Sequence, residues 1–575
     1  MSNQPQAAAG PKPSVFEGVT VYHWLVLILA SCGWLFDCMG QRIFVLAREP
    51  ALRELLGATA SDGDVKLWGG WATAVLLIGW GTGGILFGMM SDKYGRVKAM
   101  LATLVAYTVF SGLSGLARSG LEFLIYRFLC GMGVGGMFGA ATTLLAESVP
   151  PRFRTMALGL MQALSACGNM LASALSLGIT PGTENFWGRW SGWQVLFFVG
   201  VAPIILAVPI LAILKEPEPW KKAKAEAATG GAAKKVGSIP DLVRHPRWRH
   251  NLIIGVCLGL AGMVGLWGIG FFSPELITTA LKNRPIQASE FSKPGAVCIG
   301  LKESPNAAIV HLKALLSPDV VRRAEAWAAQ PSAFPEELRV ALLNDLNRLI
   351  QDGSLYEAEA FKSLSLKKGT QKLVQLVQSK GEKRDVVFLN RQLVEQVFPG
   401  AVAELLRTID KSKGRGTFVQ DIGSLLGMLT FTFIAARFSR RGAFLFAFLF
   451  AFVAVAGTFY GLKTEADIYW MLPLVGFGTL SCFAGYSIYF PEIFPTRLRG
   501  TGVGFCYNTV RYLTAPFPFL LGWLSTMMEF RTVAVLMTSI YFVGIIALLW
   551  APETKGEPLP EDDSPLPSPA PSGRA

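Results

Sequence analysis

The stretch Pro491–Arg511, PEIFPTRLRGTGVGFCYNTVR, carries the clearest signal for the fold. Five of its residues repeat an earlier set at a constant separation of 345 positions. The two sets are Glu492, Pro495, Arg497, Arg499 and Gly504, and Glu147, Pro150, Arg152, Arg154 and Gly159. A repeat of this length indicates a protein built from two related halves.

The composition indicates a protein that crosses a membrane many times. The chain has 575 residues, of which 51% are hydrophobic and 16% charged, whereas soluble proteins carry about 25% charged residues. The apolar residues gather in runs of the roughly 20 residues that span a bilayer. The net charge of +13 comes from basic residues that flank these runs, so it indicates membrane topology and not a nucleic-acid partner.

Twelve apolar segments follow one another, six on each side of a polar loop. They lie at 21–47, 68–90, 97–117, 121–146, 155–178, 193–214, 251–280, 417–437, 442–461, 467–490, 501–526 and 532–551. We therefore predict an all-α integral membrane protein with twelve transmembrane helices in two pseudo-symmetric bundles of six.

Loop charges predict the orientation. The loops that follow even-numbered segments, such as 92–98 and 215–249, are rich in Lys and Arg, and short basic loops remain in the cytoplasm. Both termini are then cytoplasmic. The N-terminus has no apolar core typical of a cleaved signal peptide. We expect a multi-pass protein of the cell membrane, either a plasma membrane or a bacterial inner membrane.

The same pattern divides the chain into seven parts. They are a flexible N-terminus (1–20), an N-terminal six-helix bundle (21–214), a cytoplasmic linker (215–250), a seventh transmembrane helix (251–281), an extracytoplasmic insertion (282–414), the rest of the C-terminal bundle (415–551) and a flexible tail (552–575).

The insertion is predicted to form a small helical domain with its own core. Ser317 can cap a helix that begins at Pro318. A second amphipathic helix covers 335–350, and two shorter ones cover 371–379 and 391–407.

A charged loop between the second and third segments, GMMSDKYGR at Gly88–Arg96, contains an acid and two bases that can pair or cap helix ends. Together with the duplicated turns, it resembles the hallmark loop of the major facilitator superfamily. In the second half Ala436 stands where Asp92 would fall. The motif RFLCGMGVGG at Arg127–Gly136 resembles the sugar-porter and metabolite–proton symporter (organic acid) branches. The resemblance covers all of the chain but the insertion and the tails.

In this family the acid–arginine clusters imply a cytoplasmic gate that pairs and parts as the cavity changes sides. The alternative is static anchoring of the loops. The expected gate residues are Gly88, Asp92, Gly95, Arg96, Glu147, Arg152, Arg154, Glu492, Arg497 and Arg499.

Asp37 and Arg127 are charged residues inside apolar segments, where charges are costly and usually functional. Asp37 and Arg127 match positions that face each other in relatives, where the acid couples a proton to transport. Burial and a nearby guanidinium act in opposite directions on a carboxyl group, so a changing separation would load and release a proton. The alternative is a permanently ionised structural pair.

Arg511 lies inside the eleventh segment, where a guanidinium can hold a carboxylate. The alternatives are snorkelling and pairing with Glu492 or Asp421. The 345 offset places Ala166 opposite Arg511, so the two halves differ here.

Five further residues are expected to contact the substrate: Tyr507, Asn508, Gln162, Asn169 and Trp267. Trp267, Ala261 and Gly262 replace the hydrogen-bonding residues of sugar porters, which argues against a hexose. We interpret Trp80 and six other tryptophans as interface or packing residues.

The resemblance implies a secondary active transporter, with proton-coupled symport of a small organic anion by alternating access. The alternatives are a transporter of a neutral solute such as a sugar or polyol, and a nutrient-sensing receptor with a transporter-like fold. No motif suggests an enzyme, a cofactor or a metal site. The expected partners are the lipid bilayer, the solute and protons, with an unidentified partner possible for the insertion.

Overall fold

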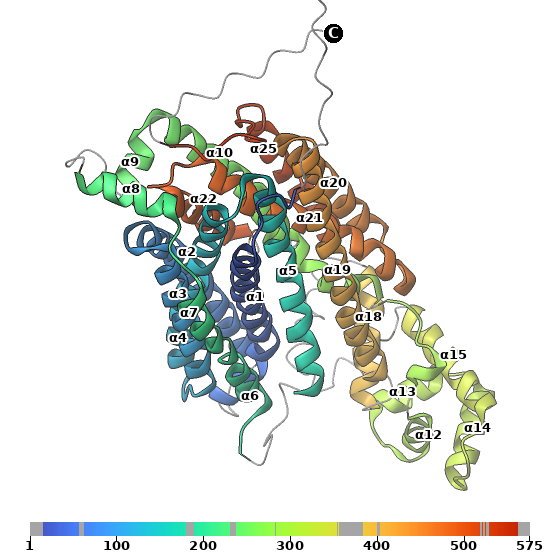
Figure 1. Cartoon of the computed structure of the whole chain (residues 1–575). Coiled ribbons are helices and arrows are strands. Elements are labelled where there is room, and N and C mark those ends of the chain that lie inside the picture. Colours follow the sequence, from blue (N-terminus) through green and yellow to red (C-terminus); the bar gives the residue numbers. More distant parts are fainter. Residues whose placement is uncertain are drawn as a thin grey trace, which may run out of the picture. The chain divides into compact units, whose positions relative to one another are not determined.

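The computed structural model describes residues 15–56, 62–179, 189–229, 237–281, 283–291, 293–352, 355, 383–398, 403–517, 520, 524 and 528–561. The regular elements within these ranges are helices (Figure 1). The chain divides into two compact units. The first comprises Met1–Phe272, Phe418–Gly461 and Met471–Ala575, and the second comprises Ser273–Thr417 and Leu462–Trp470.

The first unit contains the helices that position the candidate site. From the N-terminal part of the chain come α1 (Val21–Leu56), α2 (Asp62–Tyr94), α3 (Arg96–Gly115), α4 (Gly120–Ser148), α5 (Pro151–Gly178), α6 (Gly192–Val199), α7 (Ala207–Ile213), α8 (Glu218–Thr229), α9 (Ile239–Arg244) and α10 (Pro246–Met263). The later part supplies most of α19 (Ala403–Arg437) and α21 (Glu465–Ile493), together with α20 (Arg440–Gly461), α22 (Arg499–Thr514), α24 (Phe530–Met537) and α25 (Ile540–Ala547).

Eleven helical segments among the described residues are long and apolar enough to cross a membrane. They correspond to eleven of the twelve predicted segments. The remaining one, predicted at 501–526, begins with α22, and part of its second half lies outside the described residues.

Several helices run beyond the apolar segments that predicted them. The helix α1 extends to Leu56, and α19 begins at Ala403, whereas the apolar segments were placed at 21–47 and 417–437. Hydropathy marks only the apolar part of a helix, and these helices continue through polar residues. The predicted linker at 215–250 contains α8 and α9.

Close contacts of small residues hold the helices of the first unit together. The helices α2 and α4 lie side by side (Figure 1). A Cβ added at Gly83 would lie 2.0 Å from the carbonyl oxygen of Met132, and one added at Gly135 would lie 2.0 Å from that of Trp80. Only glycine permits this approach, which is a common way to pack helices within a bilayer.

The second unit has its own core, built on α11 (Ser273–Leu281), α12 (Pro294–Glu303), α13 (Ala307–Leu315), α14 (Pro318–Ala329), α15 (Glu336–Asp352) and α18 (Lys383–Val397). As predicted, Leu338, Leu342, Leu343, Leu346 and Ile350 are buried on one face of α15. The predicted run at 371–379 lies outside the described residues, and the run at 391–407 covers the end of α18 and the start of α19.

The role expected of Ser317 was wrong. It occupies the N-cap position of α14, but its hydroxyl makes no capping hydrogen bond. That hydroxyl donates to the Oδ1 atom of Asp345 at 2.9 Å and therefore links α14 to α15. A charged carboxylate is a strong acceptor for the Ser317 hydroxyl. Only the tertiary structure brings Asp345 close to Ser317, so the sequence pattern did not reveal this partner.

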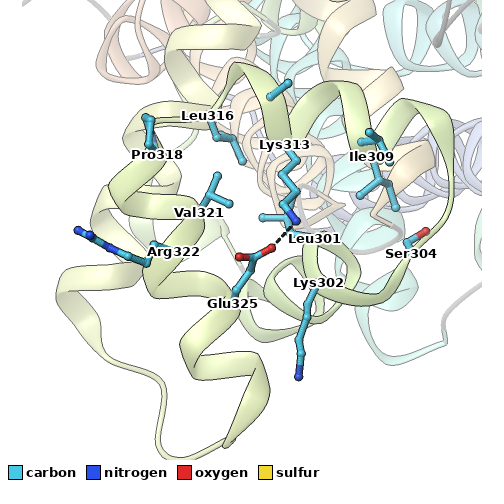
Figure 2. Close-up of a pocket in the computed structure, with 12 residues that line it drawn as sticks. Leu301, Lys302, Ser304, Ile309, Lys313, Leu316, Pro318, Val321, Arg322 and Glu325 are labelled. Carbon is cyan, nitrogen blue, oxygen red and sulfur yellow. Dashed lines mark ion pairs between the residues drawn. The ribbon is translucent and has the colours of Figure 1, made fainter.

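A shallow pocket lies among α12, α13 and α14 (Figure 2). Leu301, Ile309 and Val321 line it, and Lys313 and Glu325 form an ion pair across it. Arg322 extends away from the pocket (Figure 2). Lys313 is thus already neutralised by a partner.

Candidate functional site

A buried ionic cluster, here called the first cluster, consists of Asp92, Arg96, Glu147 and Arg499. The guanidinium of Arg96 donates to both carboxylate oxygens of Glu147, at 3.1 and 3.0 Å, and to Asp92 at 2.8 Å. Arg499 donates to the same carboxylate of Glu147. The four side chains are buried, so two carboxylates balance two arginines away from solvent, and Glu147 is shared by both arginines.

Asp92 also caps the start of α22. Its two carboxylate oxygens accept hydrogen bonds from the backbone N–H groups of Gly500 and Thr501, at 2.9 and 2.8 Å, and from the Thr501 hydroxyl at 2.7 Å. A helix N-terminus has unpaired N–H groups and a partial positive charge, which a carboxylate satisfies. Asp92 thereby joins α2 to α22.

A second cluster surrounds Glu492, which binds Arg440 through both oxygens at 3.1 and 2.9 Å. Thr554 donates to Glu492 at 2.6 Å, and Arg440 donates to the hydroxyl of Thr155 at 2.5 Å. Arg440 was not among the predicted site residues. It follows Ala436 by four residues, as Arg96 follows Asp92 by four, so this loop of the second half contained a signal that would have identified it.

The other predicted gate residues lie outside the first cluster. Arg152 pairs with Glu17 at the surface, and Arg497 pairs with Asp241 at 2.8 Å. Arg154 donates to the carbonyl of Ala146 at 2.8 Å.

Gly95 has a positive φ of 121°, which favours glycine, and a Cβ there would lie 2.2 Å from Glu216. Glu216 accepts from the N–H groups of Arg96 and Val97, at 2.6 and 3.1 Å, and so caps α3. This residue was missed by the sequence analysis.

Glu553 caps α20 in the same way. It accepts from the N–H groups of Arg440 and Arg441 at 3.0 and 3.3 Å. Burial raises the pKa of Glu553, but these N–H donors outweigh it and hold the pKa below its ordinary value. The first residues of the predicted flexible tail are therefore bound to the helices.

Arg511 is buried and lies against the aromatic ring of Trp80. Its guanidinium carbon is 3.3 Å from the Trp80 ring centroid and 5.1 Å from that of Tyr507. Its Nε donates to the Oδ1 atom of Asn508 at 3.3 Å, and its Nη1 has no hydrogen-bond partner among the described residues. A buried guanidinium with a free donor is a candidate for holding an anion.

The predicted alternative partners of Arg511 are engaged elsewhere. Glu492 binds Arg440, and Asp421 binds Arg42 at 3.0 Å, which joins α19 to α1. Snorkelling does not describe Arg511 either, because only 3% of its surface is exposed.

Asp37 is fully buried and interacts electrostatically with Arg511. Its Oδ2 accepts from Gln41 at 3.2 Å, and its Oδ1 has no hydrogen-bond partner among the described residues. Arg127 instead donates to Ser114 and to the Phe110 carbonyl. The resemblance had led us to expect that Asp37 and Arg127 form a pair. In the structure they form no pair among the described contacts.

Aromatic rings surround Arg511. Tyr507 stacks on Phe138 with ring centroids 3.8 Å apart, and Trp267 meets Trp80 edge to face at 6.1 Å. Trp80, which we had interpreted as an interface or packing residue, is thus a direct contact of the candidate anchor. Nothing in the sequence distinguished Trp80 from the other tryptophans as a contact of Arg511.

Gln162 is also buried, and its Oε1 has no hydrogen-bond partner among the described residues. Asn169 is half-buried, and its backbone carbonyl accepts from Ser173. No described contact brings either side chain to Arg511.

Asp92 of the first cluster and Arg511 contact the two ends of one helix–helix interface. Trp80, Gly84, Gly88 and Asp92 follow one another at four-residue spacing on α2, which places them on one face. They meet Arg511, Asn508, Gly504 and Gly500 of α22, in that order. We call these eight residues the α2–α22 interface.

Comparisons with known proteins agree with this architecture. The model of the Major Facilitator Superfamily matches residues 30–288. The cis,cis-muconate transport protein of Acinetobacter baylyi is 27% identical over 205 residues, which cover 36% of this chain and 48% of that protein. The benzoate transport protein of the same organism is 27% identical over 203 residues, covering 34% and 40%. The chain thus spans about half the length of the curated relatives it matches.

Among solved structures, the proton:xylose symporter XylE superposes with a TM-score of 0.54 at 17% sequence identity, over 94% of this chain and 98% of that one. This likeness concerns the fold. The chain is therefore an all-helical, multi-pass membrane protein with the fold of the major facilitator superfamily, and its predicted resemblance to the organic acid and metabolite transporters of that family is confirmed.

Proposed function

We propose that this protein is a secondary active transporter that carries a small organic anion together with protons by alternating access. The observation that carries the proposal is Arg511, a buried arginine whose Nη1 is an unused donor. Leaving a buried charged donor unsatisfied is costly, so a site that keeps one is suited to an anionic ligand.

The surroundings of Arg511 favour a planar carboxylate. Trp80, Tyr507 and Trp267 provide aromatic faces and edges near the guanidinium, and such rings stack on unsaturated ligands. The names of the relatives, a muconate and a benzoate transport protein, agree with this chemistry.

Asp37 is the proposed proton carrier. One buried cation, Arg511, stands near one buried acid, Asp37. A substrate carboxylate bound at Arg511 would add a second negative charge in a region of low dielectric, and a proton on Asp37 restores the balance. In this scheme Arg127, bound to Ser114, acts in the packing around the site.

The two ionic clusters are the proposed cytoplasmic gate, with the orientation inferred from the basic loops. Asp92 and Arg499 hold α22 against α2 and α4 in this conformation. Their separation would open a path from Arg511 to that side. Gln162 and Asn169 are proposed to line the cavity when it opens.

Uptake into proteoliposomes tests the proposal. Labelled benzoate should accumulate under an inward proton gradient, Arg511→Ala should abolish accumulation, and Asp37→Asn should remove its dependence on the gradient. The proposal fails if no aromatic or aliphatic acid accumulates.

The same assay separates the alternatives. A transporter of neutral solutes would take up a sugar or polyol with no competition from carboxylates. A receptor would bind its ligand without any net flux.

A further inference from the structure

We propose that Asn508 is a positioning residue that makes the anion affinity of Arg511 depend on the contact between α2 and α22, with Gly84 as its counterpart on α2. This inference rests on the proposed function and adds a mechanism by which opening of the clusters releases the substrate.

Asn508 uses both ends of its amide. The side chain is fully buried, and its Nδ2 donates to the Gly504 carbonyl at 2.8 Å. Its Oδ1 accepts from the Nε of Arg511 at 3.3 Å. The amide therefore orients the guanidinium, a role in addition to the substrate contact predicted from the sequence.

Gly84 forms the surface on which this amide rests. A Cβ at Gly84 would lie 1.9 Å from Nδ2, 2.1 Å from Cγ and 2.6 Å from Oδ1 of Asn508. No real contact is that short, so only a hydrogen atom fits between them. Any side chain at position 84 must displace the amide or separate the helices.

Trp80, which lies on the same helix as Gly84, contacts Arg511. It lies one turn before Gly84 on α2, and its ring covers one face of the guanidinium at 3.3 Å. Two of the contacts that fix Arg511, the Trp80 ring and the supported amide, thus depend on α2. When α2 withdraws from α22, the Trp80 contact is lost and the amide loses the surface that holds it in place, and a guanidinium held less firmly binds a carboxylate less tightly.

The arrangement exists in one half of the molecule alone. With Arg96 aligned to Arg440, which lies 344 positions later, Met428 replaces Gly84, and with the offset of 345 positions Ala163 replaces Asn508. A structural motif needed by the fold in both halves would not be expected to differ so completely, so this difference favours a role at the substrate site.

The test compares the wild type with five variants by isothermal titration with benzoate on the purified full chain. Gly84→Ala should weaken benzoate binding about tenfold, within the usual range of coupling between sites. Gly70→Ala is the matched control, because a Cβ at Gly70 on the same helix meets nothing within 4 Å, and it should bind as the wild type does.

Asn508→Ala should weaken binding by a similar factor, and adding Gly84→Ala to it should cause little further loss, because the two changes remove the same contact. If Asn508→Ala does not yield monodisperse protein, Asn508→Ser replaces it. Its hydroxyl can donate to the Gly504 carbonyl but cannot reach Arg511 as the amide does, so the same loss is expected.

The failures are distinguishable. If the wild type binds no organic acid, the proposed function fails. If the wild type binds benzoate and Arg511→Ala does not, while Gly84→Ala and Asn508→Ala bind as tightly as the wild type, only this inference is overturned. Additive losses in the double variant would also overturn it.

Discussion

Two helix interfaces related by the sequence repeat differ in their contacts: the α2–α22 interface and the interface between α5 and α19. In the first, Asp92 caps α22, and Gly88 meets the Gly500 backbone. In the second, Ala436 stands in place of Asp92, and Thr432 in place of Gly88. A Cβ at Gly159 of α5 would meet the Thr432 hydroxyl at 1.9 Å.

What the two interfaces share is the framework around them. Arg96 and Arg440 each bind a glutamate through two oxygens. Glu216 caps α3, the helix after α2, and Glu553 caps α20, the helix after α19. The comparison therefore separates the residues that maintain the fold, present twice, from those that join the interface to Arg511, present once.

The largest expected effect is at the central glutamates. Glu147→Gln leaves Arg96 and Arg499 buried without their shared carboxylate, and removal of one partner from a buried pair costs about 3–5 kcal/mol. Glu492→Gln should cost less, because it leaves one buried arginine, Arg440, with its bonds to Thr155 and Ala435. Denaturation of both purified variants would measure the difference. Equal losses would show that the clusters are equivalent.

A second pair of variants removes the acid Asp92 from one interface and introduces an acid at Ala436 in the other. Asp92→Asn should cost about 1–3 kcal/mol, since two N–H groups of α22 lose a charged acceptor. Ala436→Asp should not create an equivalent cap. The helix α5 begins at Pro151, so the N–H groups of Thr155 and Met156, which correspond to those of Gly500 and Thr501, already lie within a helix. Stabilisation by Ala436→Asp would contradict this account.

Glycine variants test how closely the helices approach. Gly88→Ala places a Cβ 2.6 Å from the Gly500 carbonyl oxygen, a backbone atom that cannot rotate away. We expect a loss of about 1–3 kcal/mol. A Cβ added by Gly159→Ala lies 1.9, 2.3 and 2.6 Å from Oγ1, Cγ2 and Cβ of Thr432, so Thr432→Gly, which removes all three atoms, should restore stability to that variant. A failure of this rescue would mean that the α5–α19 contact involves backbone atoms as well.

The smallest effects are expected at the caps. Glu216→Ala and Glu553→Ala should each cost about 1 kcal/mol, as is usual for a lost helix cap. Because the pKa of Glu553 is lowered in the folded protein, its contribution is present at neutral pH and is lost as the pH falls through that lowered pKa. The stability difference between the wild type and Glu553→Ala should therefore vanish in acid. A difference independent of pH would exclude the charge as its source.

Much of the fold could be predicted from the sequence, because apolar length and loop charge report directly on membrane helices. The repeat at Glu147 and Glu492 located both central carboxylates. Helix ends such as that of α1 could not be predicted, because polar residues continue a helix outside the apolar span.

The site was predicted less completely. Arg511 was found because a charge within an apolar segment is conspicuous. Its contact with Trp80, and the pairing of Arg42 with Asp421, depend on which helices meet, which spacing within one segment does not reveal. The substrate contact expected of Asn508 stays a prediction, and its amide also bonds to Gly504 and Arg511 of the same helix.

The central claim is that closure at Asp92 and anion binding at Arg511 are coupled through one interface. Asp92 lies twelve residues from Trp80 on α2, or about 18 Å along the helix. It touches neither Arg511 nor Asn508 among the described contacts. The most direct test is the Kd of benzoate for the wild type and for Asp92→Asn, measured by isothermal titration. The account predicts binding weakened several-fold in the variant, whereas an unchanged Kd in a variant whose thermal stability has fallen would contradict it.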